Sequence, residues 1–144
     1  MAAESLRQKQ SRFARMLPRL LDQAVKLGYD VTLGECLRSD EQAEINALGE
    51  HGRERVAQVL DREFPLLAAK VRNNGKWANG IRDSLHCYKL AIDLNLFDAQ
   101  GRWIQDSAPY AKLGAYWKSL GPDHRYGGDF GDTPHYSIEH GGRK

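Results

Sequence analysis

The residues best suited to chemistry lie in two short segments of the sequence, residues 84–93 and 132–135. The first segment contains His86 and Asp93, and the second contains Asp132 and His135. If His86, Asp93 and His135 meet, two imidazoles and one carboxylate form a three-ligand zinc site with an open fourth position, which is the catalytic pattern. The pattern alone leaves alternatives open. An arginine can also partner Asp93, and His135 and Asp132 taken singly are typical of surface and turn residues.

The seven-residue separation of His86 and Asp93 restricts how the chain can bring them together. On a helix, seven residues rise by about 10.5 Å, which is too far for two side chains to share an ion easily. On a continuous strand, an odd spacing places the two side chains on opposite faces. We therefore predict that His86 lies in a turn before a strand, that the chain doubles back at about Cys87 to Lys89, and that Asp93 stands on the polar face of that strand.

Hydrophobic periodicity indicates the elements that must position these residues. Apolar side chains at positions 90, 92, 94 and 96 alternate with polar or small ones, which predicts the clearest strand of the chain. Helices are expected over about 5–27, with a kink at Pro18, over 39–48, where Ser39 and Gln42 form a capping box, and over 107–120. Further strands are expected over 29–37, 102–104 and 135–139, and a glycine-rich loop over 127–134. Helices and strands alternate without a βαβ rhythm, so we expect an α+β fold with a small antiparallel sheet flanked by helices, in a single domain over residues 1–144.

Composition excludes several classes of protein. The 144 residues are 41% hydrophobic and 28% charged, as in globular domains, and the longest apolar run, residues 64–69, is too short to cross a bilayer. The net charge of +2 is too small to indicate nucleic-acid binding. Six lysines or arginines lie within residues 1–26, a basic helix face that is either simply solvated or in weak contact with anionic surfaces. No secretion signal is visible, so we expect synthesis in the cytoplasm without export.

Several segments together resemble a known peptidase family. The Ser-x-His-x6-Asp pattern of residues 84–93 and the Asp-x-x-His pattern of residues 132–135 look like those of the zinc peptidases that include D-alanyl-D-alanine dipeptidases, VanY-type carboxypeptidases and phage L-alanyl-D-glutamate endolysins. Residues 36–42, 93–97 and 126–130 are also similar to family segments. The resemblance runs from Val31 to Glu139 and omits residues 49–80, which we interpret as a family-variable insertion of one or two helices and a loop that flanks the site. It implies a hedgehog/DD-peptidase-like fold.

The resemblance also implies roles for individual residues. His86, Asp93 and His135 match the zinc ligands, and Asp132 matches the general base. Arg38 matches an arginine that polarises the substrate carbonyl or binds a substrate carboxylate, and Ser84 matches a supporting serine. These three, Asp132, Arg38 and Ser84, complete the expected catalytic set.

The sequence departs from the family pattern at three positions. Lys89 stands where the family usually has glycine, which questions the geometry of the turn. Tyr126 stands where the family has tryptophan, and Asp132 where many relatives have glutamate. None of the three departures removes a metal ligand.

The function implied by the resemblance is hydrolysis of the peptide stem of bacterial peptidoglycan, with Asp132 taking the proton of the attacking water. We expect a monomeric phage endolysin that cuts L-alanyl-D-glutamate, made in the host bacterial cytoplasm and acting on the wall after the membrane is permeabilised, with no nucleic-acid partner. The alternatives are a D-alanyl-D-alanine carboxypeptidase or dipeptidase, and a non-catalytic zinc-bearing binding module.

Other side chains near the motifs have weaker claims to a role in the site. Cys87 could compete as a soft metal ligand. His51, His124 and His140 are expected at the surface, although His124 and Glu139 are also candidates for supporting the ligands.

Overall fold

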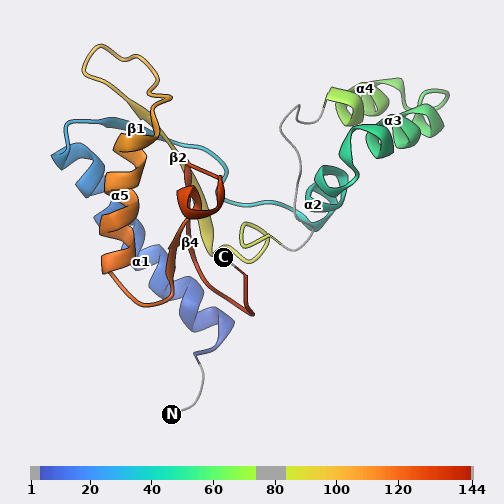
Figure 1. Cartoon of the computed structure of the whole chain (residues 1–144). Helices are drawn as coiled ribbons and strands as arrows, with labels where there is room; N and C mark the ends of the chain where they lie inside the picture. Colours follow the sequence, from blue (N-terminus) through green and yellow to red (C-terminus); the bar gives the residue numbers. More distant parts are fainter. Residues whose placement is uncertain (1–3, 74–83, 144) are drawn as a thin grey trace.

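The computed structural model describes residues 4–73 and 84–143, and within these ranges it contains five α-helices, four strands and one short 3-10 helix (Figure 1). In chain order the elements are α1 (Leu6–Lys26), β1 (Asp30–Leu33), α2 (Asp40–Ala47), α3 (Gly49–Leu60), α4 (Pro65–Asn73), β2 (Ala91–Phe97), α5 (Ser107–Ser119), β3 (His124–Tyr126), η1 (Gly127–Phe130) and β4 (His135–Ile138). This order confirms the predicted α+β class. None of the described helices is long and apolar enough to cross a bilayer.

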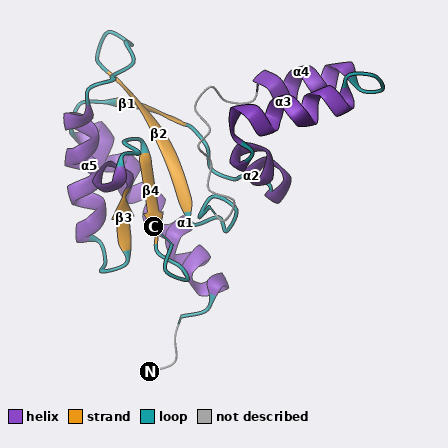
Figure 2. Ribbon diagram, turned by 45° about the vertical axis from the view of Figure 1, so that its right-hand side comes forward, coloured by secondary structure: helices purple, strands orange, loops and turns teal. Residues whose placement is uncertain are grey.

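The four strands form one antiparallel sheet in the order β1-β2-β4-β3 (Figure 2). Strand β2 is central because its alternating Ile92, Leu94 and Leu96 side chains are almost completely buried. Their face of the sheet packs against α1 and α5, and the resulting core includes Leu20 of α1 and Trp117 of α5. Alternation along β2 therefore places the side chain of Asp93 on the opposite face.

Helices α1 and α5 form because their sequences combine an N-cap with an apolar stripe. Ser5 begins α1 in a reciprocal capping box with Gln8, and Asp106 accepts a hydrogen bond from the amide of Ala108 at the start of α5. The Phe13 ring of α1 packs edge-on against the Trp117 ring of α5, with centroids 5.8 Å apart. These contacts hold the two helices on the sheet that carries the site.

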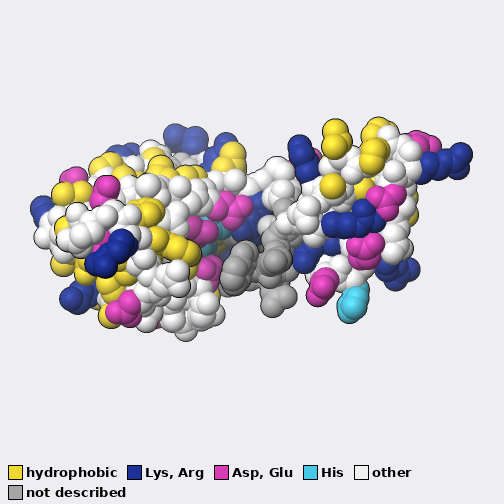
Figure 3. Space-filling view, turned by 90° about the horizontal axis from the view of Figure 1, so that it is seen from above, with side chains coloured by type: hydrophobic (Ala, Val, Ile, Leu, Met, Phe, Trp, Pro, Cys, Tyr) yellow, Lys and Arg dark blue, Asp and Glu magenta, His cyan; other side chains and the backbone are white. Residues whose placement is uncertain are grey.

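Helices α2, α3 and α4 form a lobe that stands apart from the sheet in Figures 1 and 2. Ser39 caps α2, and α3 and α4 pack on each other through Ala57, Ala68 and Val71. Two helices are thus present in the segment 49–80, while residues 74–80, where the sequence indicates a loop, lie outside the described residues. Figure 3 shows exposed hydrophobic side chains on this lobe, where Val59 and Leu66 are more than 80% exposed.

Some elements differ from the sequence-based expectation. Strand β1 ends at Leu33, four residues earlier than predicted, and strand β3 was not expected. Residues 127–130, expected as irregular loop, form the 3-10 helix η1. The expected return strand at residues 102–104 is reduced to a single bridge between Phe97 and Trp103.

Candidate metal centre

His86 is positioned by a tight turn that directly precedes strand β2. The amide of Leu90 donates to the carbonyl of Leu85, and the amide of Lys89 donates to the carbonyl of His86. This pair of nested hydrogen bonds is the Schellman arrangement, which requires a left-handed residue at its fifth position. Lys89 occupies that position with φ +56°. The peptidase family that the sequence resembles usually has glycine there. The chain therefore does double back before β2, and the turn aims His86 towards the strand that it precedes.

Asp93 and His135 are brought together by the register of the sheet. They are directly opposed on the antiparallel strands β2 and β4, so their side chains project from the same face. Asp93 is also anchored on its other side, because its amide donates to the carbonyl of Glu35 and its carbonyl accepts from the amide of Gly34. Its carboxylate is thereby fixed between two neighbouring chain segments.

Three side-chain atoms converge at this point. The distances are 3.1 Å from His86 Nε2 to His135 Nδ1, 3.2 Å from His135 Nδ1 to Asp93 Oδ1, and 3.3 Å from His86 Nε2 to Asp93 Oδ1. Ligands about 2.0–2.1 Å from a tetrahedral zinc ion are separated by about 3.3 Å, so this near-equilateral triangle fits one face of a zinc tetrahedron. Among the described residues this is the one group of at least three such side chains that could hold a metal ion.

The electrostatic environment supports the same arrangement. His86 and His135 are 2% and 5% exposed. Burial raises the pKa of Asp93, but the hydrogen bonds to His135 and His86 have the larger combined effect and hold that pKa well below its ordinary value. The carboxylate is therefore charged. The opposite ring nitrogens, His86 Nδ1 and His135 Nε2, are buried and have no hydrogen-bond partner among the described residues. The polar contacts of both rings thus lie on the side that faces Asp93.

Asp132 is presented by the loop between η1 and β4. Its amide donates to the carbonyl of Gly127, and its Oδ2 lies 3.8 Å from His135 Nδ1. The side chain is 54% exposed, yet the protein around the carboxyl and the nearby Asp93 raise its pKa, against the lowering effect of His135. A Cβ atom on Gly127 would lie 2.1 Å from the Asp132 carbonyl oxygen and 2.6 Å from the His135 Cβ, so only glycine fits beside this loop.

Arg38 lies near the triangle of candidate metal ligands, but it is already paired. Its Nε donates to Glu35 Oε1 at 2.9 Å and its Nη2 donates to Glu35 Oε2, a bidentate ion pair that raises the pKa of Arg38. The amide of Arg38 also donates to the carbonyl of His86 at 3.4 Å. The sequence did not indicate the contact between Glu35 and Arg38, because a separation of three residues predicts a side-chain contact only within a helix.

The remaining predicted residues lie around this centre. Ser84 Oγ accepts a hydrogen bond from the amide of His86, so it supports the turn. Tyr126 is buried against Tyr136, with ring centroids 5.4 Å apart. Cys87 is half-buried and is not part of the metal-binding group found among the described residues. The ring of Phe130 is 47% exposed, and its centroid lies 6.0 Å from that of the His135 ring.

The predicted surface position of His124 is wrong. His124 is 2% exposed, and its ring packs 4.5 Å from that of Trp117 in the core, because β3 places it against α5. Glu139 pairs with Arg125. His51 is exposed as predicted, while His140 is half-buried with its ring 5.7 Å from that of Tyr88.

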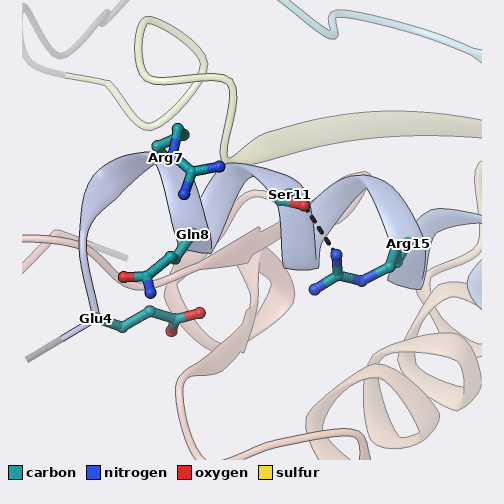
Figure 4. Close-up of a pocket in the computed structure, with 5 residues that line it drawn as sticks. All are labelled: Glu4, Arg7, Gln8, Ser11 and Arg15. Carbon is teal, nitrogen blue, oxygen red and sulfur yellow. Dashed lines mark hydrogen bonds between the residues drawn. The ribbon is translucent and has the colours of Figure 1, made fainter.

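A polar pocket of about 350 Å³ lies on the first turns of α1 (Figure 4). It is lined by Glu4, Arg7, Gln8, Ser11 and Arg15, and Arg15 donates to Ser11 Oγ at 2.8 Å. It contains none of the three candidate metal ligands. The predicted contact of this basic helix with anionic surfaces stays a prediction.

Comparisons with known proteins give a structural similarity. No model of a known protein family and no curated protein matches the chain. Among experimental structures, the chain is similar to a mutant of the vancomycin-resistance D,D-pentapeptidase VanY from a VanB-type resistance cassette, in complex with Zn(II). The TM-score is 0.47 at 18% identity, over 88% of this chain and 70% of that chain. A similarity of this size does not assign a function to the chain.

Proposed function

We propose that the protein is a zinc peptidase that hydrolyses the peptide stem of bacterial peptidoglycan, by cutting the bond between L-alanine and D-glutamate. The observation that carries the metal assignment is the triangle formed by His86 Nε2, Asp93 Oδ1 and His135 Nδ1, whose edges of 3.1–3.3 Å suit tetrahedral zinc. The substrate is inferred from the resemblance of the sequence motifs to the phage endolysins of the zinc peptidase family.

The residues around the triangle have the chemistry for amide hydrolysis. A zinc ion held there would polarise the substrate carbonyl and lower the pKa of water in the fourth position. Asp132, beside His135, would take the proton of the attacking water and return it to the leaving amine. Arg38 would donate a hydrogen bond to the carbonyl oxygen as negative charge develops on it.

Digestion of purified peptidoglycan tests the proposal. We expect new amino termini from D-glutamate in muropeptides analysed by mass spectrometry, loss of this release with a chelator, and its return when zinc is added. Release of D-alanine instead would identify a carboxypeptidase or dipeptidase, and zinc binding without any cleavage would identify a binding module.

Substitution at Asp132 tests its role separately. We expect Asp132→Ala to keep its zinc and to lose most of its turnover, because the metal ligands stay in place while the base is removed. A near-normal rate, or a variant without zinc, would refute the role assigned to Asp132. A phage endolysin that reaches the wall after membrane permeabilisation is the biological setting that we propose.

A further inference from the structure

Glu35 connects the arginine of the site to one of the metal-binding side chains. Its carboxylate holds the Arg38 guanidinium through two hydrogen bonds, and the two side chains are only 30% and 15% exposed. Its main-chain carbonyl accepts the amide hydrogen bond of Asp93 at 2.9 Å. Because both contacts arise from one residue, the Glu35–Arg38 pair is fixed relative to the metal-binding triangle.

The pair also changes the charge that a substrate meets. Arg38 is close enough to Asp93 and Asp132 to interact electrostatically with both carboxyl groups. Glu35 cancels the positive charge of Arg38 and accepts hydrogen bonds from its Nε and Nη2 atoms. The remaining terminal N–H groups of Arg38 can still donate hydrogen bonds to a substrate, but the ion pair as a whole has no net charge. The other acidic side chains next to the centre, Asp93 and Asp132, add negative charge only. The Glu35–Arg38 pair therefore offers hydrogen bonds without a net positive charge.

We propose that Glu35 is a specificity-determining residue that selects substrates in which the residue on the leaving side of the cut bond carries no free α-carboxylate. This inference rests on the proposed function and deepens it. It assigns Arg38 to the carbonyl oxygen rather than to a substrate carboxylate. For a stem peptide it favours the α-amidated form of the D-glutamyl residue over the free acid, because Asp93 and Asp132 offset the charge of a zinc ion held in the triangle and the paired Arg38 offers a free α-carboxylate no further attraction.

A matched pair of synthetic peptides tests the inference. The peptides are L-alanyl-D-γ-glutamyl-L-lysine and the same peptide with the glutamyl α-carboxyl group amidated. For the zinc-loaded protein we expect kcat/KM to be about tenfold higher for the amide, and we expect Glu35→Gln to reduce that ratio about five- to tenfold by restoring the Arg38 charge. Glu35→Asp keeps the charge, so it should keep most of the preference.

Glu54→Gln is the matched control, because it removes a carboxylate that is paired with Arg72 on the helical lobe. Its ratio of amide to acid should equal that of the unmodified protein. Circular dichroism and thermal unfolding of each variant show whether it is folded. If Glu35→Gln does not fold, the dissociation constants of the unmodified protein decide, because equal values for the acid and the amide refute the selectivity. A ratio that Glu35→Gln leaves unchanged would overturn the inference.

A binding measurement separates this inference from the proposed function. Titration of N-acetyl-D-alanine and of its amide into the zinc-loaded protein, followed by NMR, gives two dissociation constants without any cleavage. We expect tighter binding of the amide, and a loss of that preference in Glu35→Gln but not in Glu54→Gln. If neither peptide is cleaved, the proposed function fails while these constants still test Glu35. Equal dissociation constants in the unmodified protein would refute its selectivity.

Discussion

Replacing Lys89 by glycine should stabilise the protein, because this residue holds the turn that presents His86 in a left-handed conformation. Its φ is +56°, and its side chain is exposed, so no side-chain packing is lost on substitution. A non-glycine residue in this conformation costs about 1–2 kcal/mol. Glycine removes that strain but loses about 0.5–1 kcal/mol through greater freedom of the unfolded chain. The expected net gain is about 0.5–1 kcal/mol.

The measurement is thermal unfolding at one fixed zinc concentration, because metal binding to the folded state itself raises the Tm. For a chain of this length, the gain corresponds to a Tm increase of about 2–3 °C. Lys112→Gly is the matched control, since Lys112 is an exposed lysine within α5 and glycine should cost about 0.7 kcal/mol there. The two substitutions therefore have opposite predicted signs. A Tm that falls in Lys89→Gly as it does in Lys112→Gly would refute the assignment of strain to this turn.

Two other substitutions test the packing beside the site and the ion pair between α1 and the turn that follows α5. Gly127→Ala should destabilise the protein by about 2–3 kcal/mol and weaken zinc binding at least tenfold, because the added Cβ would displace the Asp132 loop and His135. Denaturant unfolding and zinc titration measure the two effects. If both results match those of the unmodified protein, this prediction is wrong. Asp123→Asn should cost about 1–2 kcal/mol at pH 7, because the Arg12 hydrogen bonds hold the pKa of Asp123 below its ordinary 3.8. A lowered pKa gives stability that is present above pH 3.8 and is lost as the pH falls through the folded-state pKa. The unfolding curves of the unmodified protein and of Asp123→Asn should therefore converge below about pH 4. A difference in unfolding free energy that stays constant from pH 7 to pH 3 would argue against the Arg12–Asp123 pair.

The regular elements could be predicted where the sequence period is long enough to detect. The helix over residues 107–120 and the strand over residues 90–96 follow from repeated apolar spacing, and the structure has α5 and β2 there. Strand β3 has three residues and η1 has four, so each is too short for a repeating apolar pattern to be recognised in the sequence. These elements are fixed by tertiary contacts, such as the close approach of Gly114 to the Tyr126 ring.

The site shows the same division between local and long-range information. The odd spacing of His86 and Asp93 was sufficient to require a turn, and the departure at Lys89 is explained by the left-handed conformation found there. The register that opposes Asp93 to His135 joins residues 42 positions apart, which local patterns cannot fix. The pairing of Glu35 with Arg38 likewise depends on an irregular segment between β1 and α2, for which spacing predicts no side-chain contact.

Zinc binding by single-ligand variants tests the central claim most directly. We expect one zinc ion per chain by equilibrium dialysis and a tetrahedral absorption spectrum on cobalt substitution. We also expect a loss of affinity of at least a hundredfold in His86→Ala, Asp93→Ala and His135→Ala, with Cys87→Ser unchanged. Full zinc affinity in Asp93→Ala, or its loss in Cys87→Ser, would contradict the three-ligand centre on which the proposed chemistry depends.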